Sequence, residues 1–245
     1  MKPYYQDSHV TIYHGDSKEL SLDIIKNKVD LIVTDPPYSV SLKNGKKHTR
    51  NRNQGSRNYD FFEGDSNWAE MTSNVVEILA IVIGTMKDTG SVYAWCGHRQ
   101  ISIITERLEL LKFKTRPICW IKHCPIPCPP NAGFDSGFEM GIYAYRDNRT
   151  FITHASQKSN VIRSDSYRHG IPGKVNHPTQ KPFGTIRPFI EISSLIGETV
   201  LDPFMGSGTT LLCAKQIGRK AIGIEIEEKY CEIAAKRMSQ EVFDW

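Results

Sequence analysis

The chain has 245 residues, of which 39% are hydrophobic and 24% are charged, and its net charge is +4. This composition is ordinary for a globular protein, and the mild positive charge permits a nucleic-acid partner without requiring one. No apolar run reaches the length of a membrane span, and the first residues lack an apolar signal core, so we expect a cytoplasmic protein. Its six cysteines are then expected to be mostly reduced thiols.

The first half of the chain alternates between short apolar runs and amphipathic stretches. The run 29–34 is rich in β-branched residues and ends at an abrupt proline break, which predicts a buried strand. Apolar side chains at helical spacing predict a helix over 69–87 that ends at Asp88 to Gly90. The same reasoning predicts a short helix over 20–25, a second amphipathic helix over 99–112, and strands over 8–14, 91–95 and 116–121.

Three segments between these elements are polar or rich in Pro and Gly. The stretch 39–67 is long and basic, and a loop of this length inside a compact domain is typically functional or mobile. Residues 123–137 contain too many Pro and Gly residues for regular structure, whereas 139–146 predicts a strand. We expect that strand to pair antiparallel with 116–121 at one edge of the sheet. The stretch 147–176 is again polar and basic.

The last third of the chain has a regular alternation of strands and helices. It predicts helices over 182–196 (with Pro188 as a kink or in the first turn), 211–217 and 228–238, strands over 198–202 and 220–226, and a glycine loop over 203–210. This spacing is typical of parallel β/α units, so we predict an α/β fold with a doubly wound sheet, mostly parallel with one antiparallel edge strand. A single domain would span residues 1–245, with 39–67 and 147–176 as loops or a small lobe within it.

The four residues Asp35-Pro36-Pro37-Tyr38 directly follow the predicted strand 29–34. The prolines have no N–H donors, but their carbonyl groups remain acceptors. Asp35 and the Pro36 carbonyl can therefore each accept a hydrogen bond from an amino group on a flat ring, while Tyr38 stacks on the face of that ring. The pattern favours a site for a planar amine over a plain Pro-rich turn.

The glycine loop predicts a second binding site. A strand ends at Asp202, Gly206 and Gly208 let the backbone approach a ligand closely, and a helix begins afterwards. Glu225 ends the next strand, about nineteen residues after Gly206, where nucleotide folds place the acid that binds a ribose. Because a full G-x-G-x-x-G is absent, an adenosine ligand without a pyrophosphate fits better than a dinucleotide.

These two predicted sites can face one crevice. In open α/β sheets, ligands bind beyond the carboxyl ends of the strands, and both Asp35 and Phe204 lie just past such ends. The simplest chemistry that joins an adenosine cofactor to a planar amine is transfer of a group from the first to the second.

Three motifs together carry a family resemblance. DPPY at 35–38, HPTQKP at 177–182 and DPFMGSGTT at 202–210 resemble the amino-group DNA methyltransferases, which transfer a methyl group from S-adenosylmethionine to adenine N6 or cytosine N4. The order, with DPPY before the cofactor loop, resembles the circularly permuted beta arrangement of that family and implies its methyltransferase-type sheet. His177 opens the second motif, and we expect it to orient that segment rather than to be catalytic. The resemblance covers residues 11–38, 91–122, 139–146 and 177–240.

The resemblance implies a role for each matched residue. The target-base motif would supply the catalytic residues Asp35, Pro36, Pro37 and Tyr38. The cofactor would be held by Asp16, Asp35, Thr179, Lys181, Pro182, Asp202, Phe204, Gly206, Ser207, Gly208, Thr209 and Glu225. Within this set Asp16 would contact the adenine of the cofactor, Glu225 its ribose, and Lys181 its carboxylate. The chemistry requires no metal.

An exocyclic amine is a poor nucleophile because its lone pair is delocalised into the ring. Orientation and electrostatics, supplied by Asp35 and the Pro36 carbonyl, would therefore carry the reaction after the base is flipped out of the duplex. Asp before PPY favours adenine N6 over cytosine N4, which stays the first alternative. A non-catalytic nucleic-acid-binding subunit is an alternative of another class, and RNA or protein glutamine amines are further conceivable acceptors.

Basic side chains are the candidates for contact with double-stranded DNA. Those that follow the target-base motif could clamp phosphates around a flipped nucleotide: Lys43, Lys46, Lys47, Arg50, Arg52 and Arg57. Arg163 and Arg168 could read guanine through bidentate contacts. Because no dedicated recognition domain is visible, we expect a short or permissive site. The protein would act as a monomer or homodimer, with a restriction endonuclease as a possible partner.

The cysteines have simpler interpretations. His123, Cys124 and Cys128 are close in sequence, but prolines separate the cysteines and no second cysteine pair follows, which argues against a zinc site. Cys213 and Cys231 lie on predicted helix faces and are expected in the core.

Overall fold

The computed structural model describes residues 2–19, 25, 28–38, 68–126, 134–152, 158–166 and 173–240. Most of the predicted helix over 20–25 and the whole basic stretch 39–67 lie outside these residues. Within the described part of the chain, no helix combines the length and apolar character needed to cross a membrane.

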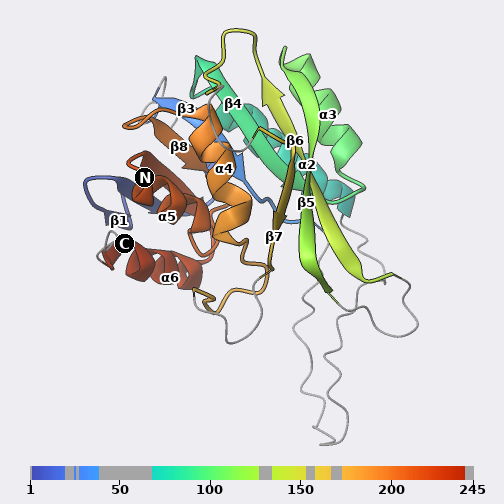
Figure 1. Cartoon of the computed structure of the whole chain (residues 1–245). Coiled ribbons are helices and arrows are strands. Elements are labelled where there is room, and N and C mark those ends of the chain that lie inside the picture. Colours follow the sequence, from blue (N-terminus) through green and yellow to red (C-terminus); the bar gives the residue numbers. More distant parts are fainter. Residues whose placement is uncertain are drawn as a thin grey trace, which may run out of the picture.

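The described strands form one nine-stranded sheet in the order β1-β2-β9-β8-β3-β4-β6-β5-β7 (Figure 1). Their bounds are β1 Tyr5–Gln6, β2 Val10–His14, β3 Val29–Thr34, β4 Met86–Cys96, β5 Lys114–Ile126, β6 Ser136–Tyr145, β7 Val161–Ser164, β8 Thr199–Asp202 and β9 Lys220–Glu225. The described helices are η1 Ser17–Glu19, α2 Trp68–Ile83, α3 Ile101–Leu110, α4 Phe183–Ser193, α5 Thr209–Gln216 and α6 Glu228–Ser239.

The sheet is mostly parallel, as predicted, but its antiparallel strands differ in number and place. Strands β2, β9, β8, β3 and β4 pair in parallel. β1 pairs antiparallel with β2 at one edge, and β6 is antiparallel to both of its neighbours, β4 and β5. The expected pairing of 116–121 with 139–146 is therefore confirmed, but β6 lies inside the sheet. β7 lies within the polar stretch 147–176, where no strand was predicted. It pairs with β5 and forms the edge of the sheet beyond β5.

Helices cover both faces of the sheet (Figure 1). Side chains of β3 alternate between two hydrophobic clusters because successive strand residues point to opposite faces. Leu31 and Val33 pack in the cluster that includes α4, α5 and α6, whereas Ile32 packs in the one that includes α2 and α3. Cys213 and Cys231 are fully buried in the first cluster, which confirms their expected place in the core.

Several boundaries differ from the predicted ones for physical reasons. α2 ends at Ile83, and Asp88 to Gly90 belong to β4. Lys87 Nζ bonds Asp30 Oδ1 at 2.6 Å, which holds the start of β4 along β3. Despite the prolines, β5 continues to Ile126 and β6 begins at Ser136, so both strands enter the stretch 123–137 that we expected to be irregular.

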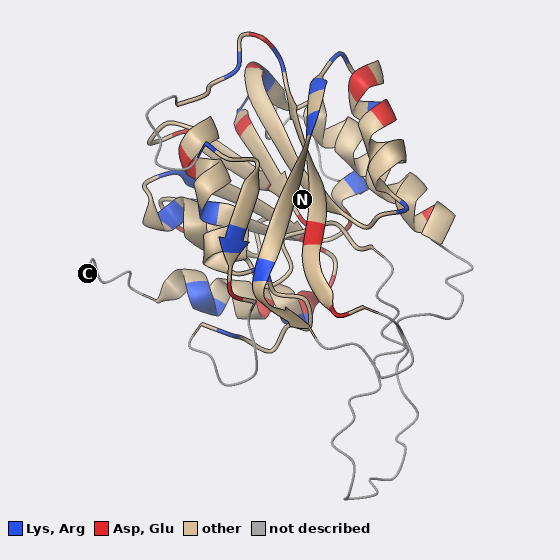
Figure 2. Cartoon of the chain, turned by 45° about the vertical axis from the view of Figure 1, so that its right-hand side comes forward, with Lys and Arg blue, Asp and Glu red and all other residues tan. Residues whose placement is uncertain are grey.

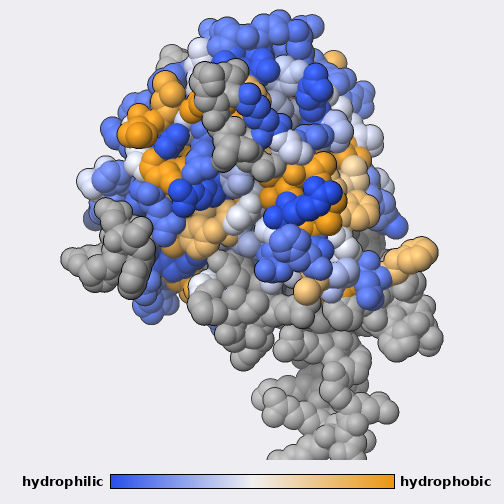
Figure 3. Space-filling view, viewed as in Figure 1, coloured by the Kyte–Doolittle hydropathy of each residue, from blue (hydrophilic) through white to orange (hydrophobic). Residues whose placement is uncertain are grey.

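Charged and hydrophobic residues separate as expected for a sheet that is covered by helices on both faces. Figure 2 shows Lys, Arg, Asp and Glu mainly on the outer helices and at strand ends, while most of the sheet carries other residues. On the face seen in Figure 3, hydrophobic side chains break a mainly hydrophilic surface in patches. Leu195 and Ile196, which follow α4, are among the large apolar side chains that stay exposed.

Candidate active site

The predicted sites meet because β3 and β8 are parallel neighbours. The Thr34 hydroxyl, at the end of β3, donates to Asp202 Oδ1 at the end of β8 over 2.8 Å. The next residue along the first segment is Asp35, and the glycine loop follows the second. The target-base motif and the cofactor loop therefore begin side by side at the carboxyl edge of the sheet, as the position of both motifs past strand ends predicts.

Asp35 is held by a lysine from a distant part of the chain. Lys181 Nζ, just before α4, bonds Asp35 Oδ2 at 2.6 Å and Tyr38 Oη at 2.9 Å. The other carboxylate oxygen, Asp35 Oδ1, is buried and has no hydrogen-bond partner among the described residues. Buried carboxylate oxygens are normally satisfied, so an oxygen left without a donor indicates a place for a ligand's N–H group.

Tyr38 is fixed from several sides. Its hydroxyl donates to Glu139 Oε2 of β6 at 2.7 Å while it accepts from Lys181. A Cβ atom on Gly97, just after β4, would lie 3.2 Å from the Tyr38 Cβ, so Gly97 leaves room for the ring. Gln100 Nε2 donates to the Pro37 carbonyl at 3.2 Å. The whole motif is thereby attached to the end of β4 and the start of α3.

The electrostatics of this cluster follow from burial and opposed charges. Burial raises the pKa of the Asp35 carboxyl, and the Lys181 ammonium opposes that rise. Burial alone would lower the pKa of Lys181, but Asp35, Tyr38 and Glu139 outweigh it and raise that pKa well above its usual value. Lys181 is therefore a permanent cation at the site. Burial also raises the pKa of Tyr38 well above its usual value, which keeps its hydroxyl neutral.

The glycine loop depends on backbone conformations that favour glycine. Gly206 has φ +51° and Gly208, which precedes α5, has φ +77°. A Cβ atom on Gly206 would lie 2.9 Å from His177 Nε2. The Gly206 N–H donates to Glu225 Oε2 at 2.9 Å, so the predicted ribose-binding acid touches the predicted cofactor loop. Burial raises the pKa of Glu225.

His177, which opens the second motif, and Arg237, which no motif contains, also support the glycine loop. Arg237 of α6 is buried, and its Nη1 donates to the Ser207 carbonyl at 2.6 Å and lies 3.4 Å from Thr209 Oγ1. The His177 ring contacts Tyr230 edge-on, with centroids 4.4 Å apart. Burial lowers the pKa of His177 to about 4, so the ring is neutral at pH 7 and suits the orienting role predicted for it.

Asp16 lies beside the same loop. The Gly15 N–H donates to the Glu225 carbonyl at 2.9 Å, and Ser17 Oγ donates to the Pro203 carbonyl at 2.5 Å. These two bonds bracket Asp16 between the end of β9 and the start of the glycine loop. Its Oδ1 accepts the Lys18 N–H at 2.9 Å. The N-terminal Gly-Asp and the glycine loop are thus brought together, although some 190 residues separate them.

The remaining predicted cofactor residues have distinct environments. Thr179 is exposed, whereas Pro182 is buried at the start of α4. Asp202 is 3% exposed, and its Oδ1 also accepts the Phe204 N–H at 3.1 Å, so it shapes the loop from within. Burial raises the pKa of Asp202 to about 7. The structure pairs Lys181 with carboxylates of the protein, so contact of Lys181 with a cofactor carboxylate stays a prediction.

Sequence reasoning missed three residues of this region: Glu139, Lys122 and Arg237. Lys122 Nζ of β5 pairs with Glu139 Oε1 at 2.8 Å, and its side chain is 2% exposed. The available signal was a charged residue within each apolar stretch, and such residues usually face solvent. The pairing of β5 with β6 is what brings Lys122 and Glu139 together.

The predicted DNA contacts are mostly outside the described residues. Lys43, Lys46, Lys47, Arg50, Arg52, Arg57 and Arg168 lie there, as does Cys128 of the zinc alternative. Arg163 is exposed on β7 and stays a candidate for contact with DNA. His123 Nδ1 lies 3.3 Å from Asp165 Oδ1.

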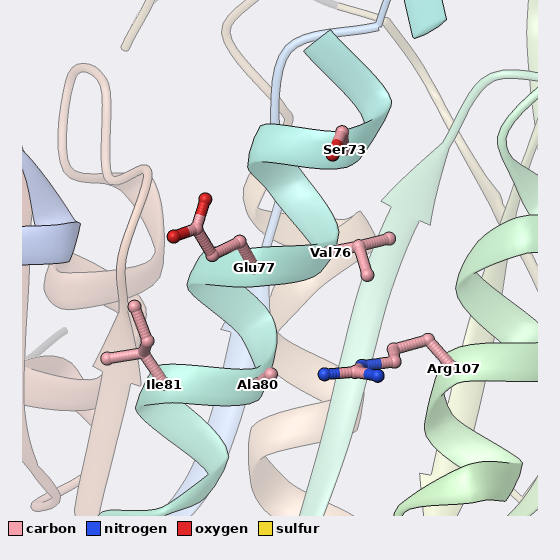
Figure 4. A pocket seen from close by; sticks show the side chains of 6 residues that line it. All are labelled: Ser73, Val76, Glu77, Ala80, Ile81 and Arg107. Carbon is pink, nitrogen blue, oxygen red and sulfur yellow. The ribbon is translucent and has the colours of Figure 1, made fainter. Parts of the chain in front are cut away.

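A separate pocket of about 540 Å³ lies on the outer side of α2. Figure 4 shows that five of its lining side chains come from α2 and one, Arg107, from α3: the α2 residues are Ser73, Val76, Glu77, Ala80 and Ile81. None of the three motifs contributes to it. We therefore assign the chemistry to the carboxyl edge of the sheet and not to this pocket.

The arrangement fits an S-adenosylmethionine-type cofactor. Gly206 and Gly208 leave the backbone open to close approach, the Glu225 carboxylate accepts the Gly206 N–H, and the segment around Asp16 bonds the start of the same loop through Ser17. Asp35 stands next to that loop with an unsatisfied acceptor. Such a cofactor would supply a methyl group on a positively charged sulfur.

Comparison with known proteins agrees with this geometry. A DNA methylase family model for N6 and N4 enzymes matches residues 29–236. The chain is 28% identical over 260 residues to the type II methyltransferase M2.LlaDCHI of Lactococcus lactis subsp. cremoris, covering 98% of this chain and 93% of the relative. It is 29% identical to the type II methyltransferase M2.DpnII of Streptococcus pneumoniae, with the same coverage of both.

Solved structures show the same architecture. The crystal structure of the M1.HpyAVI–SAM complex superposes with a TM-score of 0.70 at 28% identity, covering 94% of this chain and 100% of that one. The cytosine-N4-specific PvuII DNA methyltransferase reaches 0.76 at 19% identity, covering 99% and 91%, which shows a shared fold. The match over most of the chain, together with the site described above, places this protein in the N6/N4 DNA methylase family, as an S-adenosylmethionine-dependent DNA methyltransferase.

Proposed function

We propose that this enzyme methylates the N6 amino group of adenine in double-stranded DNA after the base is flipped out of the helix. The observation that carries the proposal is the buried Asp35 Oδ1, an acceptor without a donor among the described residues. An exocyclic amine offers the N–H group that this oxygen lacks. The adjacent Pro36 carbonyl offers a second acceptor, and no proline N–H competes for it.

The residues of the site would act by orientation and charge. Lys181 holds Asp35 Oδ2, so that Oδ1 keeps one direction toward the amine. Asp35 and the Pro36 carbonyl accept the two amine hydrogens and concentrate electron density on the nitrogen, which faces the methyl donor. Because burial raises its pKa, Asp35 is also suited to take the proton that the nitrogen loses. The Tyr38 ring, fixed through its hydroxyl, stacks on the base and offsets part of the flipping cost.

Asp in the first position of DPPY favours adenine within the family, and cytosine N4 is the alternative acceptor. The PvuII enzyme, which is cytosine-N4-specific by name, shares the fold, so the fold alone does not select the base. The test is to incubate duplex DNA with labelled S-adenosylmethionine, digest it to nucleosides, and identify the methylated product by mass. N6-methyladenine supports the proposal, and N4-methylcytosine replaces it with the alternative.

The same assay separates catalysis from binding alone. A non-catalytic nucleic-acid-binding subunit would incorporate no label into any duplex, whereas the proposed enzyme labels adenine-containing DNA. Competition with RNA and with a glutamine-containing protein tests the other amine acceptors. The proposed enzyme keeps its preference for duplex DNA in that competition.

The proposal extends to partners and location. The basic segment 39–67 and the segment 147–176 would contact DNA within a single domain that spans residues 1–245, as a monomer or homodimer paired with a restriction endonuclease. A cytoplasmic location fits the free state of the described cysteines, Cys96, Cys119, Cys124, Cys213 and Cys231. Sequencing of DNA from cells that express the protein, with modified bases identified, gives the recognition site.

A further inference from the structure

A buried row of alternating charges leads from the sheet to the target-base motif. Lys122 Nζ of β5 pairs with Glu139 Oε1 at 2.8 Å, Glu139 Oε2 lies 3.0 Å from Lys181 Nζ, and Lys181 pairs with Asp35 at 2.6 Å. The side chains of Lys122, Lys181 and Glu139 are 2%, 6% and 21% exposed. Two cations and two carboxylates thus alternate in a largely desolvated line that ends at the proposed base-binding oxygen.

We infer that Glu139 is a positioning residue for methyl transfer, which acts through Lys181 and Tyr38 to hold Asp35 and the stacking ring against the target base. The inference rests on the proposed function and adds a residue that none of the three motifs contains. Glu139 itself contacts neither the Asp35 oxygen that faces the base nor the glycine loop in any described bond. Its effect on the reaction is therefore indirect.

The geometry gives Glu139 control over two groups at once. One oxygen, Oε2, accepts the Tyr38 hydroxyl at 2.7 Å and also faces the Lys181 ammonium. Lys181 in turn donates to Tyr38 Oη at 2.9 Å, which closes a triangle of hydrogen bonds. Charge-assisted bonds are short and directional, so this triangle sets both the plane of the Tyr38 ring and the direction of the Lys181 side chain.

Lys122 completes the charge balance. Without it, two carboxylates, Glu139 and Asp35, would share the single Lys181 cation in a buried place. With it, each carboxylate has an ammonium group of its own, and Lys181 can stay close to Asp35. Burial would raise the pKa of Glu139, but Lys181 and Lys122 outweigh it and lower that pKa to about 2, so Glu139 is ionised throughout the working pH range.

The charge of Glu139 also reaches Asp35. Among the described residues, the charged and titratable groups around Asp35 are Lys181 before α4, Glu139 on β6, Tyr38 in the motif, Cys96 at the end of β4 and Asp202 at the end of β8. Glu139 adds to the rise in the Asp35 pKa that burial begins. Neutralising Glu139 should therefore lower the pKa of Asp35. If the reaction needs an ionised Asp35, the acid limb of the pH–rate profile then moves to lower pH.

The test compares Glu139→Gln with a surface control, Asp147→Asn, which loses a carboxylate from an exposed pair with Lys114. The readouts are the single-turnover rate of methyl transfer, its pH profile, the Kd for S-adenosylmethionine, and the melting temperature. For E139Q we expect a rate roughly tenfold to a hundredfold below wild type, the size of one or two lost charge-assisted bonds. Its acid limb moves to lower pH and its cofactor Kd stays within about twofold. D147N matches wild type in all four.

A second variant separates positioning from folding. E139Q leaves Lys122 buried without its carboxylate, which destabilises the protein by itself. The double variant E139Q/K122M removes that cation, so its melting temperature recovers while its rate stays low. A double variant that recovers both would overturn the inference and leave Glu139 a structural role only.

The inference and the proposed function fail differently. Wild-type protein that methylates no DNA overturns both. Wild-type protein that is active while E139Q has the same rate and the same pH profile overturns the inference alone.

Discussion

The two halves of the active site are built by different physical means. On the cofactor side, the glycine loop is held by its backbone: Gly206 and Gly208 have positive φ, and main-chain groups bond Glu225 and Arg237. On the target-base side, the site is held by charged side chains: Lys181 pairs with both Asp35 and Glu139. Changes on the first side should alter shape and cofactor affinity, whereas changes on the second should alter the rate.

This contrast has a chemical reason. The cofactor is a constant ligand, and a rigid backbone surface needs no adjustment between turnovers. The charge on the reacting amine changes during the reaction. Charged groups fixed beside it can therefore stabilise the transition state. Asp202 links the two halves, since it accepts hydrogen bonds from both the Thr34 hydroxyl and the Phe204 N–H.

The largest effect is expected for Asp35→Ala. Loss of the carboxylate removes the acceptor for the target amine and leaves Lys181 with Glu139 as its remaining carboxylate, so the single-turnover rate should fall about a thousandfold. The Kd for S-adenosylmethionine, measured by calorimetry, should stay near the wild-type value because the glycine loop is unchanged. A D35A protein that is still active, or one that no longer binds the cofactor, would contradict the assignment of Asp35 to the methyl-transfer step alone.

Asp202, which contacts both halves, should make the unfolding free energy depend on pH. The pKa of Asp202 is about 7 in the folded protein and near 3.8 when unperturbed, so its stabilising effect is complete below about pH 3.8 and is lost as pH rises through 7. Asp202→Asn does not titrate. Between pH 5 and 8 the wild type should therefore lose on the order of 2 kcal/mol of unfolding free energy relative to D202N. Urea titrations at both pH values measure this difference, and equal losses in the two proteins would contradict it.

A smaller effect is expected on the cofactor side from Gly206→Ala. Its φ of +51° disfavours a side chain, and the new Cβ would lie 2.9 Å from His177 Nε2, so the cofactor Kd should rise about tenfold. Gly197→Ala is the matched control, because Gly197 has φ +84° but nothing within 4 Å of a new Cβ. G197A should lose stability and keep its cofactor affinity. An unchanged affinity in G206A would mean that the loop does not hold the cofactor.

The smallest effect is expected outside both halves. Arg163→Ala on β7 should weaken binding of the recognised duplex by about 1 kcal/mol, roughly fivefold, and relax discrimination at one base pair. Competition binding with single-base variants of the site measures both quantities. A uniform loss over all sequences, with a shallower salt dependence, would reassign Arg163 to a phosphate contact.

The sequence predicts the cofactor side and the central strands well because the determinants there are local. A run rich in β-branched residues before two prolines predicts β3 at its observed bounds, and the strand–glycine–helix spacing predicts the loop after β8. The rule that ligands bind at the carboxyl ends of parallel strands correctly predicts that the segments starting at Asp35 and at Pro203 begin side by side.

The rest depends on pairings between distant residues that local patterns do not encode. β7 has four residues with only Ile162 buried, so it resembles the polar stretch around it. Glu139 in β6 has the pattern of a solvent-facing strand residue, and its partners Lys122 and Lys181 come from other elements. The motifs therefore predict Asp35 and Lys181, whereas the part that Glu139 and Lys122 play is visible only after the strand order is known.

The central claim is that Asp35 Oδ1 accepts the amine of the target base. The most direct measurement is a crystal structure of the enzyme with an unreactive cofactor analogue and duplex DNA that contains the recognised site. We predict a flipped adenine whose N6 lies at hydrogen-bond distance, about 2.7–3.2 Å, from Asp35 Oδ1, with Lys181 still on Oδ2. A flipped base whose amine lies beyond the reach of Asp35, or an Asp35 Oδ1 bonded to the protein itself, would contradict the account.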